Sequence, residues 1–511
     1  MKIGIIGGGT AGWLAAAMAV LPDVYKSKNG ERKKFEIVVI DSDEISIIGA
    51  GEGSTGLFSE YIDTKLSTLG INTIDFLYET ESTLKLGIKF KDWKEKGHQY
   101  LSPIQPTTTS MKNIDADLLS FVLSGEYYDS TICGHLMNKG LSSFKKDKKN
   151  YLKIHSYHFD AHKVGQYFKK ICIKNGVKNI KGTVDSVIKN TENGFIKSVR
   201  IKETNEIVDA DLWFDCSGFS KVLVKEMNMG WKSYSEYLPV NNAIPYIHNF
   251  ENDENILPET LAWAMPNGWM WQIPTQQRYG CGYVYSDMFT NYDNALEELI
   301  KTTGRKIEPI RNIKFEVGRL EKFWDKNVLA IGLSSNFLEP LQATSIHSTI
   351  IQLDYFLYHH LNYDVDRFEY IESSKIYNNF VSKMVDDFRD LIQIHYMGGR
   401  EDTDFWKYCK YDLKKTDKVK SILEISKYRS PSFLDFEMYH GAGSWGVWCW
   451  TLCGLGYINK YNAEKTLSQH SLIKRAQNSF RSISYENQLS SISLMTNKEL
   501  IKNLISKKII K

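Results

Sequence analysis

The sequence predicts an α/β unit over residues 1–350 and a mainly helical unit over residues 351–511. In the first unit, short apolar runs typical of buried strands alternate with segments of helical spacing, beginning with a β-α-β pattern at the N-terminus. After about residue 345 the strand patterns become rare, and long amphipathic, tyrosine-rich segments dominate. The fold class is therefore α/β, with a helical part that follows the sheet-forming part.

Six segments are regular enough to be assigned to elements. The strand patterns are apolar runs bounded by polar or glycine-rich stretches, and the helical patterns place apolar side chains three and four residues apart. Strands are expected at 3–6, 35–41, 209–215 and 328–332, and helices at 10–20 and 161–175.

Size and composition indicate a large globular protein with no nucleic-acid or membrane partner. The chain has 511 residues, of which 42% are hydrophobic, and a net charge of +3, so no strongly basic surface is expected. No run of about 18 apolar residues and no signal-peptide pattern occurs. The seven cysteines lack a metal-binding spacing, so we expect a reducing, cytoplasmic environment and no metal site.

A glycine-rich turn after the first strand predicts a dinucleotide site. GGGTAG fits G-x-G-x-x-G, in which the first glycine permits a tight turn, the second lets the backbone approach a pyrophosphate, and the third lets the helix pack on the strand. An acid at the end of the second strand is placed to accept from a ribose hydroxyl. The candidate cofactor residues are Gly7, Gly9, Thr10, Ala11, Gly12 and Asp41. This pattern alone leaves NAD and FAD open.

Later segments resemble those of one family. DCSGF (215–219) and IGLSSNFLEPLQATSI (331–346) each follow a predicted strand and are similar to cofactor-contacting segments of FAD-dependent aromatic hydroxylases, which favours FAD. With its other motifs, the chain resembles flavin-dependent halogenases of the tryptophan-halogenase type over most of its length. The motifs, in order, are GGGTAGW, GAGEGST, LKLGIKFKDW, YHFDAHKV, DLWFDCSGF, WMWQIP, RYGCGYVYS, NFLEPLQATSI, FRDLIQIHY and DTDFW. The most specific of them is W-x-W-x-I-P.

The resemblance implies a fold and an activity. The fold is the FAD-binding Rossmann-like fold of the flavin monooxygenase superfamily, with an inserted β-sheet and a C-terminal helical, substrate-binding unit. The activity is halogenation of an electron-rich aromatic substrate: reduced FAD (FADH2), O2 and a halide ion form hypohalous acid, which travels through an internal channel. A separate flavin reductase is the expected partner, because the chain has no second nucleotide fingerprint. Whether the protein is a homo-oligomer stays open.

The same resemblance assigns further cofactor residues and a channel wall. The later cofactor contacts are Gly49, Ala50, Gly51, Glu52, Gly332 and Leu341. The wall that keeps the organic substrate from the flavin is formed by Trp269, Trp271, Ile273 and Pro274. From the residues alone, GWMWQIP is more simply a strand that buries two large rings, and the two roles are compatible.

Lys85 is the candidate catalytic residue. The alternation over 84–91 predicts a half-exposed strand whose lysines face water. The resemblance instead matches Lys85 with the essential lysine of the family, and Lys89 with the later lysine of its K-x-x-x-K pattern. As an ammonium ion, Lys85 can donate a hydrogen bond to the departing oxygen of hypohalous acid, and as an amine it can become a haloamine. The sequence leaves both roles open.

The segment after the EPL motif departs from the family pattern. Gln342 stands where tryptophan-specific members have glutamate, Ala343 where they have serine, and Ser345 where glycine is usual. Gln342 remains a candidate catalytic residue, although a carboxamide carries no charge. The resemblance implies that the halide binds at the backbone N–H groups of Thr344 and Ser345. Because serine restricts φ more than glycine does, we expect a looser site that uses bromide or iodide better than chloride.

The substrate end departs further from the family. No acid matches the one that holds the tryptophan amine there, so another electron-rich aromatic is expected in place of free tryptophan. An aromatic sandwich is the candidate binding device, and the core of a helix is the competing interpretation. The residues concerned are Trp445, Trp448 and Trp450.

Two other functions stay open at this point. An FAD-dependent aromatic hydroxylase of the same superfamily would give a hydroxylated product, which its mass would reveal. A non-catalytic flavin-binding protein, suggested by Gln342, would release hydrogen peroxide and give no halogenated product.

Overall fold

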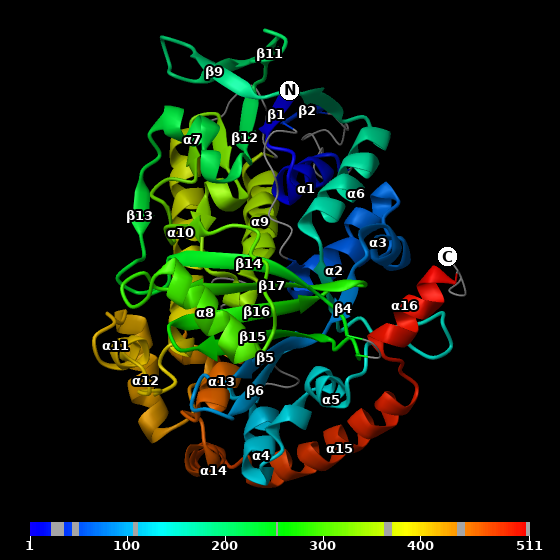
Figure 1. The fold of residues 1–511 in the computed structure, drawn as a ribbon, viewed down its shortest axis with the longest axis vertical. Helices are drawn as coiled ribbons and strands as arrows, with labels where there is room; N and C mark the ends of the chain where they lie inside the picture. Colours follow the sequence, from blue (N-terminus) through cyan, green and yellow to red (C-terminus); the bar gives the residue numbers. More distant parts are fainter. Residues whose placement is uncertain are drawn as a thin grey trace.

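Two large sheets and a group of C-terminal helices form the molecule (Figure 1). The structure is a computed structural model. It describes residues 1–21, 35–42, 51–105, 111–251, 254–361, 370–436 and 445–506. The first sheet lies at one end of the long axis, the second crosses the middle, and the helices after residue 400 gather mostly at the other end (Figure 1). Within the described ranges, no helix is long and apolar enough to cross a membrane.

The first sheet contains the predicted β-α-β unit. Its six strands lie in the order β20-β21-β12-β1-β2-β8, and neighbours are parallel except β20 and β21. They are β1 (Lys2–Ile6), β2 (Glu36–Asp41), β8 (Lys178–Lys181), β12 (Leu212–Asp215), β20 (Trp324–Asp325) and β21 (Val328–Ala330). The four strands expected from the sequence all belong to this sheet, although β12 and β21 are shorter than expected.

Helices cover one face of this sheet, and a small sheet covers the other. On the first face, α1 (Thr10–Ala19) and α6 (Ala161–Lys174) pack on apolar side chains of β1 and β2, as predicted. On the second face lie α7 (Val222–Met227) and an antiparallel sheet in the order β11-β10-β9. The strands of this small sheet are β9 (Val184–Lys189), β10 (Ile196–Ile201) and β11 (Ile207–Asp209).

The inserted sheet has seven strands in the order β18-β14-β17-β16-β15-β5-β6, and β15 and β5 form its parallel pair. They are β5 (Gly87–Lys91), β6 (Gln99–Pro103), β14 (Asn242–Asn249), β15 (Glu259–Met265), β16 (Gly268–Pro274), β17 (Arg278–Tyr285) and β18 (Ile313–Lys314). On the outer face, α8 (Tyr292–Thr303) shares an apolar cluster with Met270 and the tyrosines of β17. The inner face, with Phe90, Trp269 and Trp271, belongs to the main core.

Two three-stranded sheets and several helices connect the large sheets. One small sheet, in the order β3-β7-β4, consists of β3 (Glu52–Gly53), β4 (Thr83–Lys85) and β7 (Ser156–Phe159). The other, β13-β19-β22, consists of β13 (Trp231–Ser233), β19 (Gly318–Leu320) and β22 (Asn336–Phe337). The helices, with 3₁₀ helices marked η, are α2 (Gly56–Asp63), η2 (Leu66–Leu69), α3 (Thr73–Thr80), α4 (Ala116–Ser124), η3 (Tyr127–Ser130), α5 (Ile132–Lys139) and η4 (Gly218–Ser220).

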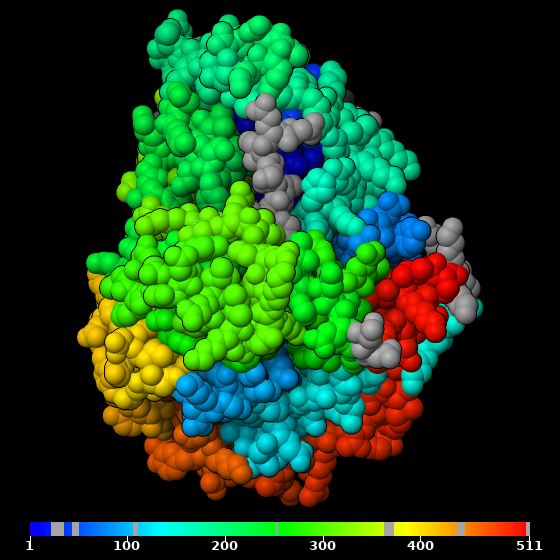
Figure 2. Space-filling model, viewed as in Figure 1, coloured from blue at the N-terminus to red at the C-terminus, as the bar shows by residue number. Residues whose placement is uncertain are grey.

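The rest of the chain is mainly helical, as predicted. Its elements are η5 (Gly332–Ser334), η6 (Pro340–Gln342), α9 (Thr344–Tyr355), the π-helix η7 (Phe356–His360), α10 (Tyr370–His395), α11 (Asp404–Tyr411), α12 (Asp417–Tyr428), η8 (Phe433–Asp435), α13 (Trp445–Leu455), α14 (Lys460–Gln469), α15 (Ile473–Ile492) and α16 (Asn497–Ile505). The expected boundary at residue 350 lies inside α9, which shares the main core with α1. The last helices return to earlier parts of the chain, since α15 packs on α4 and α16 on α3 (Figure 2).

The expectation of a single half-exposed strand over 84–91 is wrong. The chain breaks at Leu86, so that β4 pairs with β7 in one sheet while β5 pairs with β15 and β6 in another. All of β4 is buried, and Lys85 is only 1% exposed. Lys89 on β5 is half-buried. The alternation therefore belongs to two short strands with different surroundings.

Candidate active site

The carboxyl ends of the central parallel strands meet where the predicted cofactor loop begins. Gly7 has φ +114°, and a Cβ built on it would lie 2.2 Å from the Cys216 carbonyl oxygen. A Cβ on Gly12 would lie 1.9 Å from the oxygen of Gly7. A Cβ on Gly332 (φ +69°) would lie 2.8 Å from that of Ala11, so the η5 segment lies against α1. The turn and the close packing of α1 therefore require glycine, as the motif predicts.

The first turn of α1 is open to an anion. Its N-cap residue, Gly9, provides no side-chain cap, and no acidic residue stands in the first turn. A Cβ built on Gly9 would meet no atom of the described chain within 4 Å, so the space beside this helix end is free. Uncapped N–H groups at the positive end of a helix dipole suit a pyrophosphate. The residues of this loop therefore fit FAD.

Asp41 lies at the end of β2 beside this loop. Its carboxylate is 6% exposed and forms ion pairs with Lys169 (3.0 Å) and Lys181 (2.9 Å). Burial tends to raise the pKa of Asp41, but the two lysines outweigh it and hold the pKa below its ordinary value. A hydrogen bond from a ribose to this carboxylate stays a prediction. Gly49 and Ala50 lie outside the described residues.

Three further candidate cofactor residues are tied into neighbouring elements. Thr10 begins α1, and its Oγ1 donates to the Ala161 carbonyl oxygen at 3.0 Å. Glu52 pairs with Phe159 across β3 and β7, and burial together with a nearby acid raises the pKa of Glu52 to about 7. Leu341 is buried in the main core within η6.

The short segment before α2 joins the cofactor loop side to the rest of the site. A Cβ on Gly51 would lie 3.3 Å from a side chain of β16. A Cβ on Gly53 would lie 2.9 Å from Lys85 Nζ. Thr55 Oγ1 lies 2.7 Å from His347 Nδ1 of α9, within hydrogen-bonding distance. This one segment therefore contacts the strand with the two tryptophans, the candidate lysine and the helix expected to bind halide.

Lys85 is buried, and none of the residues that the structure describes provides a counter-ion for it. Among the described residues, no hydrogen bond or ion pair reaches its Nζ, and the polar groups beside the same Gly53 are Thr260 and His158, 2.8 Å apart through Oγ1 and Nε2. Burial lowers the pKa of Lys85 to about 7. Burial, and then the positive charge of Lys85, lowers the pKa of His158, so this histidine is neutral. Near neutral pH, Lys85 is therefore available both as ammonium ion and as amine.

The four predicted wall residues lie on β16. Trp269 and Trp271 project from the inner face of the sheet with their ring centroids 6.2 Å apart, and both are buried. A Cβ on Gly282 of β17 would lie 2.1 Å from the Trp271 ring, so this glycine makes room for the indole. Ile273 is buried on the same face, whereas Pro274, the last residue of the strand, lines the groove on the outer face and so does not belong to the predicted wall. The strand that buries two large rings is therefore present.

Glu339 fixes the ring of Trp269. Its Oε2 accepts hydrogen bonds from Trp269 Nε1 and from the Tyr396 hydroxyl, each at 2.5 Å. The side chain is fully buried, and within the described part of the chain its Oε1 has no hydrogen-bond partner. Burial raises the pKa of Glu339 to about 7, although the two hydrogen bonds favour the charged form.

Gln342 belongs to the same cluster of side chains. It is 6% exposed, and its Nε2 lies 2.8 Å from His395 Nε2 at the end of α10. His395 Nδ1 lies 2.8 Å from the Tyr100 hydroxyl on β6. Trp93 contacts the rings of both His395 and Trp269, with centroid distances of 5.7 and 6.2 Å. The tryptophan strand and Gln342 are thus connected through two side chains, Trp93 and His395.

The two predicted halide-binding residues begin helix α9. Thr344 and Ser345 lie in its first turn, and Ala343 before them is left-handed (φ +55°) and provides no side-chain cap. The first N–H groups of α9 are therefore available to an anion. The expectation that serine restricts this backbone is wrong, because Ser345 is helical, a conformation that serine adopts freely, and its side chain is exposed. The strained residue is Ala343.

The three C-terminal tryptophans do not form one aromatic sandwich. All are buried on α13, and successive residues of a helix are rotated by about 100°, so the last two point in opposite directions. Trp445, Trp448 and Trp450 pack respectively on Phe433, Phe436 and Tyr127. The helix-core interpretation therefore describes them. Helix α13 still adjoins the site, because a Cβ on Gly454 would lie 2.2 Å from the Tyr100 ring.

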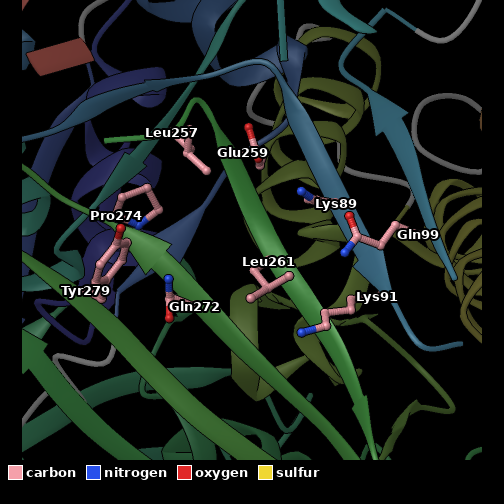
Figure 3. Close-up of a pocket in the computed structure, with 9 residues that line it drawn as sticks. All are labelled: Lys89, Lys91, Gln99, Leu257, Glu259, Leu261, Gln272, Pro274 and Tyr279. Atoms are coloured by element: carbon pink, nitrogen blue, oxygen red, sulfur yellow. The ribbon is translucent and has the colours of Figure 1, made fainter. Parts of the chain in front are cut away.

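The outer face of the inserted sheet carries a shallow groove of about 210 Å³ (Figure 3). Lys89 of β5 and Glu259 of β15 line it. Side chains alternate along a strand, so Glu259 faces this groove while its neighbour Thr260 faces the side of Lys85. Lys89 is thus separated from Lys85 by the thickness of the sheet.

Comparison with known proteins identifies the family. Residues 2–485 match the family model described as Tryptophan halogenase, so the chain belongs to the tryptophan halogenase family. It is 30% identical over 484 residues to tryptophan 7-halogenase RebH of Lentzea aerocolonigenes, covering 86% of this chain and 85% of that protein. It is also 30% identical over 476 residues to tryptophan 6-halogenase ThaL of Streptomyces albogriseolus, covering 86% and 84%.

Solved structures agree with this placement. The tryptophan C-6 flavin-dependent halogenase Tar14 superposes with a TM-score of 0.86 at 26% identity, covering 98% of this chain and 99% of that chain. A tryptophan halogenase from Shewanella frigidimarina gives 0.86 at 24% identity, covering 99% and 97%, and so supports the fold. The predicted fold class is confirmed. The prediction of a flavin-dependent halogenase that uses FADH2 and halide on an aromatic substrate is confirmed at the level of the family.

Several residues of the site were beyond the reach of the sequence patterns. Glu339 is part of the EPL motif, but nothing in the motif indicates its bond to a tryptophan 70 residues away. Tyr100 and His395 are 295 residues apart, and no periodicity connects them. The one signal for His395 is its place in the FRDLIQIHY motif.

Gly9→Ala is expected to weaken FAD binding about 10-fold or more, which corresponds to about 1.4 kcal/mol. The added Cβ meets no described atom, but it occupies the space beside the first turn of α1 where a pyrophosphate would lie. Gly12→Ala is the contrasting variant, because its Cβ collides with Gly7 and should lower Tm. Fluorescence titration with FAD and a thermal melt measure both effects. Wild-type FAD affinity in Gly9→Ala would refute the phosphate-loop assignment.

Proposed function

We propose that this protein transfers a halogen from hypohalous acid to an electron-rich aromatic substrate other than free tryptophan, with Lys85 as the activating group. Phenols and indoles are the substrate class, because their rings are electron-rich. The observation that carries the proposal is the burial of Lys85 with no counter-ion among the described residues. Keeping such a lysine charged costs several kcal/mol of folding free energy. A residue needed only for packing would be apolar and would carry no such cost, so the charge of Lys85 indicates a functional role.

FAD, when reduced and bound as FADH2, would supply two electrons and two protons, which with O2 and one further proton convert a halide ion into hypohalous acid and water. A separate flavin reductase provides the reduced cofactor. In this proposal Gly9 and the first turn of α1 hold the phosphates, whereas Trp269 and Trp271 keep the organic substrate away from the flavin. The support for the wall is that both rings are buried on one strand, with Trp269 held by Glu339.

Lys85 acts as an ammonium ion. It donates a hydrogen bond to the oxygen of hypohalous acid while the aromatic ring attacks the halogen. The halogen–oxygen bond breaks, and the oxygen leaves as water with the proton of Lys85. The ring then loses its own proton, which restores the ammonium ion. A pKa of Lys85 near 7 supports this cycle, because the proton can be given up and regained near neutral pH.

The halide site lies at the first turn of α9 and prefers bromide or iodide to chloride. The donors are the backbone N–H groups of Thr344 and Ser345, and the neighbouring Gln342 is neutral. Chloride holds its water most strongly of the three ions. Backbone N–H donors carry no full positive charge, so they offset less of this dehydration cost than a cationic group would, which favours the larger ions.

Lys85→Met should reduce halogenated product by about 100-fold or more while FAD binding is unchanged, because it removes the proton donor but retains the volume of the side chain. Lys89→Met is the matched control, since it alters a strand lysine on the opposite face of the sheet. Product is quantified by mass spectrometry with a reductase supplying FADH2. The assignment fails if Lys85→Met halogenates at the wild-type rate, and a hydroxylated wild-type product would favour a hydroxylase.

Competition between equimolar chloride, bromide and iodide on one phenol or indole tests the halide preference. We expect brominated or iodinated product to dominate, because those ions lose their water more easily. Ser345→Gly is the control, and it should leave the product ratio unchanged since Ser345 is already helical and exposed. A product mixture dominated by chloride incorporation would contradict the preference.

A further inference from the structure

The amide of Gln342 is held by a single neighbour. Its Nε2 lies 2.8 Å from His395 Nε2, and this is the one hydrogen bond of the side chain among the described residues. His395 is in turn 2.8 Å from the Tyr100 hydroxyl through Nδ1. The carbonyl oxygen of the amide, Oε1, is therefore directed away from the histidine and accepts no hydrogen bond from a described residue.

The imidazole of His395 is fixed in its orientation. It is fully buried and stacks on Phe90, with ring centroids 4.6 Å apart and planes 13° apart. Tyr100 stacks on the same Phe90 ring at 4.6 Å and 7°. Trp93 packs edge-on against the imidazole at 5.7 Å. Because Phe90 and Tyr100 are opposite each other in β5 and β6, the inserted sheet itself sets the position of the histidine.

The tautomer of His395 and the orientation of the Gln342 amide are linked, because the two side chains share one hydrogen bond. Burial lowers the pKa of His395 to about 3, so its imidazole is neutral and has one donor and one acceptor nitrogen. With the amide nitrogen of Gln342 facing it, Nε2 is the acceptor, and Nδ1–H donates to the Tyr100 oxygen. An amide without such a neighbour could present its donor or its acceptor end alike.

We propose that His395, seated on Phe90 and fixed by Tyr100, orients Gln342 so that Oε1 accepts a hydrogen bond from the O–H of hypohalous acid while Lys85 donates to the same oxygen. His395 is thus a positioning residue. A carboxylate presents an acceptor oxygen in either orientation, because both of its oxygens accept hydrogen bonds. A neutral amide has one acceptor end, so it can replace the carboxylate only if a partner such as His395 fixes which end faces the hypohalous acid. This inference rests on the proposed function, since it presumes hypohalous acid at Lys85.

The first test is a rescue experiment. His395→Phe retains the stack on Phe90 but removes both hydrogen bonds, and it should lower kcat for halogenation about 100-fold with little change in the KM of the aromatic substrate. Adding Gln342→Glu to this variant should restore most of kcat, because the carboxylate needs no orienting partner. His135→Phe is the matched control, since His135 is also buried and bonded through Nδ1, to Asp129 at 3.0 Å, and should retain wild-type kcat.

Two outcomes of this test overturn the proposal. One is a wild-type kcat in His395→Phe, and the other is a loss of kcat that Gln342→Glu does not rescue in a variant with an unchanged Tm. The second test is independent of halogenation: ¹⁵N NMR of the imidazole should show the Nδ1–H tautomer in the resting wild-type protein and a shifted Nε2 signal in Gln342→Leu. An Nε2–H tautomer overturns the inference even if halogenation is confirmed. Absence of halogenated product from the wild type would refute the proposed function instead.

Discussion

The rest of the site depends on one constraint, the free-energy cost of burying the Lys85 ammonium ion with no counter-ion in the described part of the chain. A carboxylate beside Nζ would remove this cost and would hold the pKa of Lys85 high, so that its proton would stay in place at neutral pH. Instead the polar groups that lie with Lys85 beside Gly53 are a threonine, Thr260, and a neutral histidine, His158. Gly53 belongs to the same arrangement, because a Cβ there would lie 2.9 Å from Nζ and would crowd the lysine.

The inserted sheet provides these surroundings by having two different faces. Its inner face presents Phe90, Trp269 and Trp271 to the main core, and its outer face carries the α8 cluster and the polar groove with Lys89. Since side chains alternate along each strand, a shift of one residue in register would exchange the two sets. The same sheet therefore excludes water from Lys85, places the candidate wall and supports the Phe90 platform for a histidine.

The parts of this molecule that could be predicted from the sequence are local in the chain. The cofactor loop follows from Gly7 and Gly12, where the backbone conformation and packing require glycine. The β-α-β unit follows from apolar runs that are neighbours in the sequence. The surroundings of Lys85 could not be predicted, because the alternation of apolar and polar residues over 84–91, which suggests one half-exposed strand, is divided between two sheets. The contact of Gln342 with His395 spans 53 residues and depends on where α10 ends, which no local pattern contains.

The pKa of Lys85 is the quantity that tests this account most directly. NMR of the protein labelled with ¹³C at lysine Cε, with the resonance assigned by its absence in Lys85→Met, gives a titration curve for this one side chain. We predict a midpoint of about 7, set by burial. A midpoint near 10.4, as in a solvated lysine, would mean that Lys85 is not both buried and unpaired, and would contradict its role as a proton donor that turns over at neutral pH.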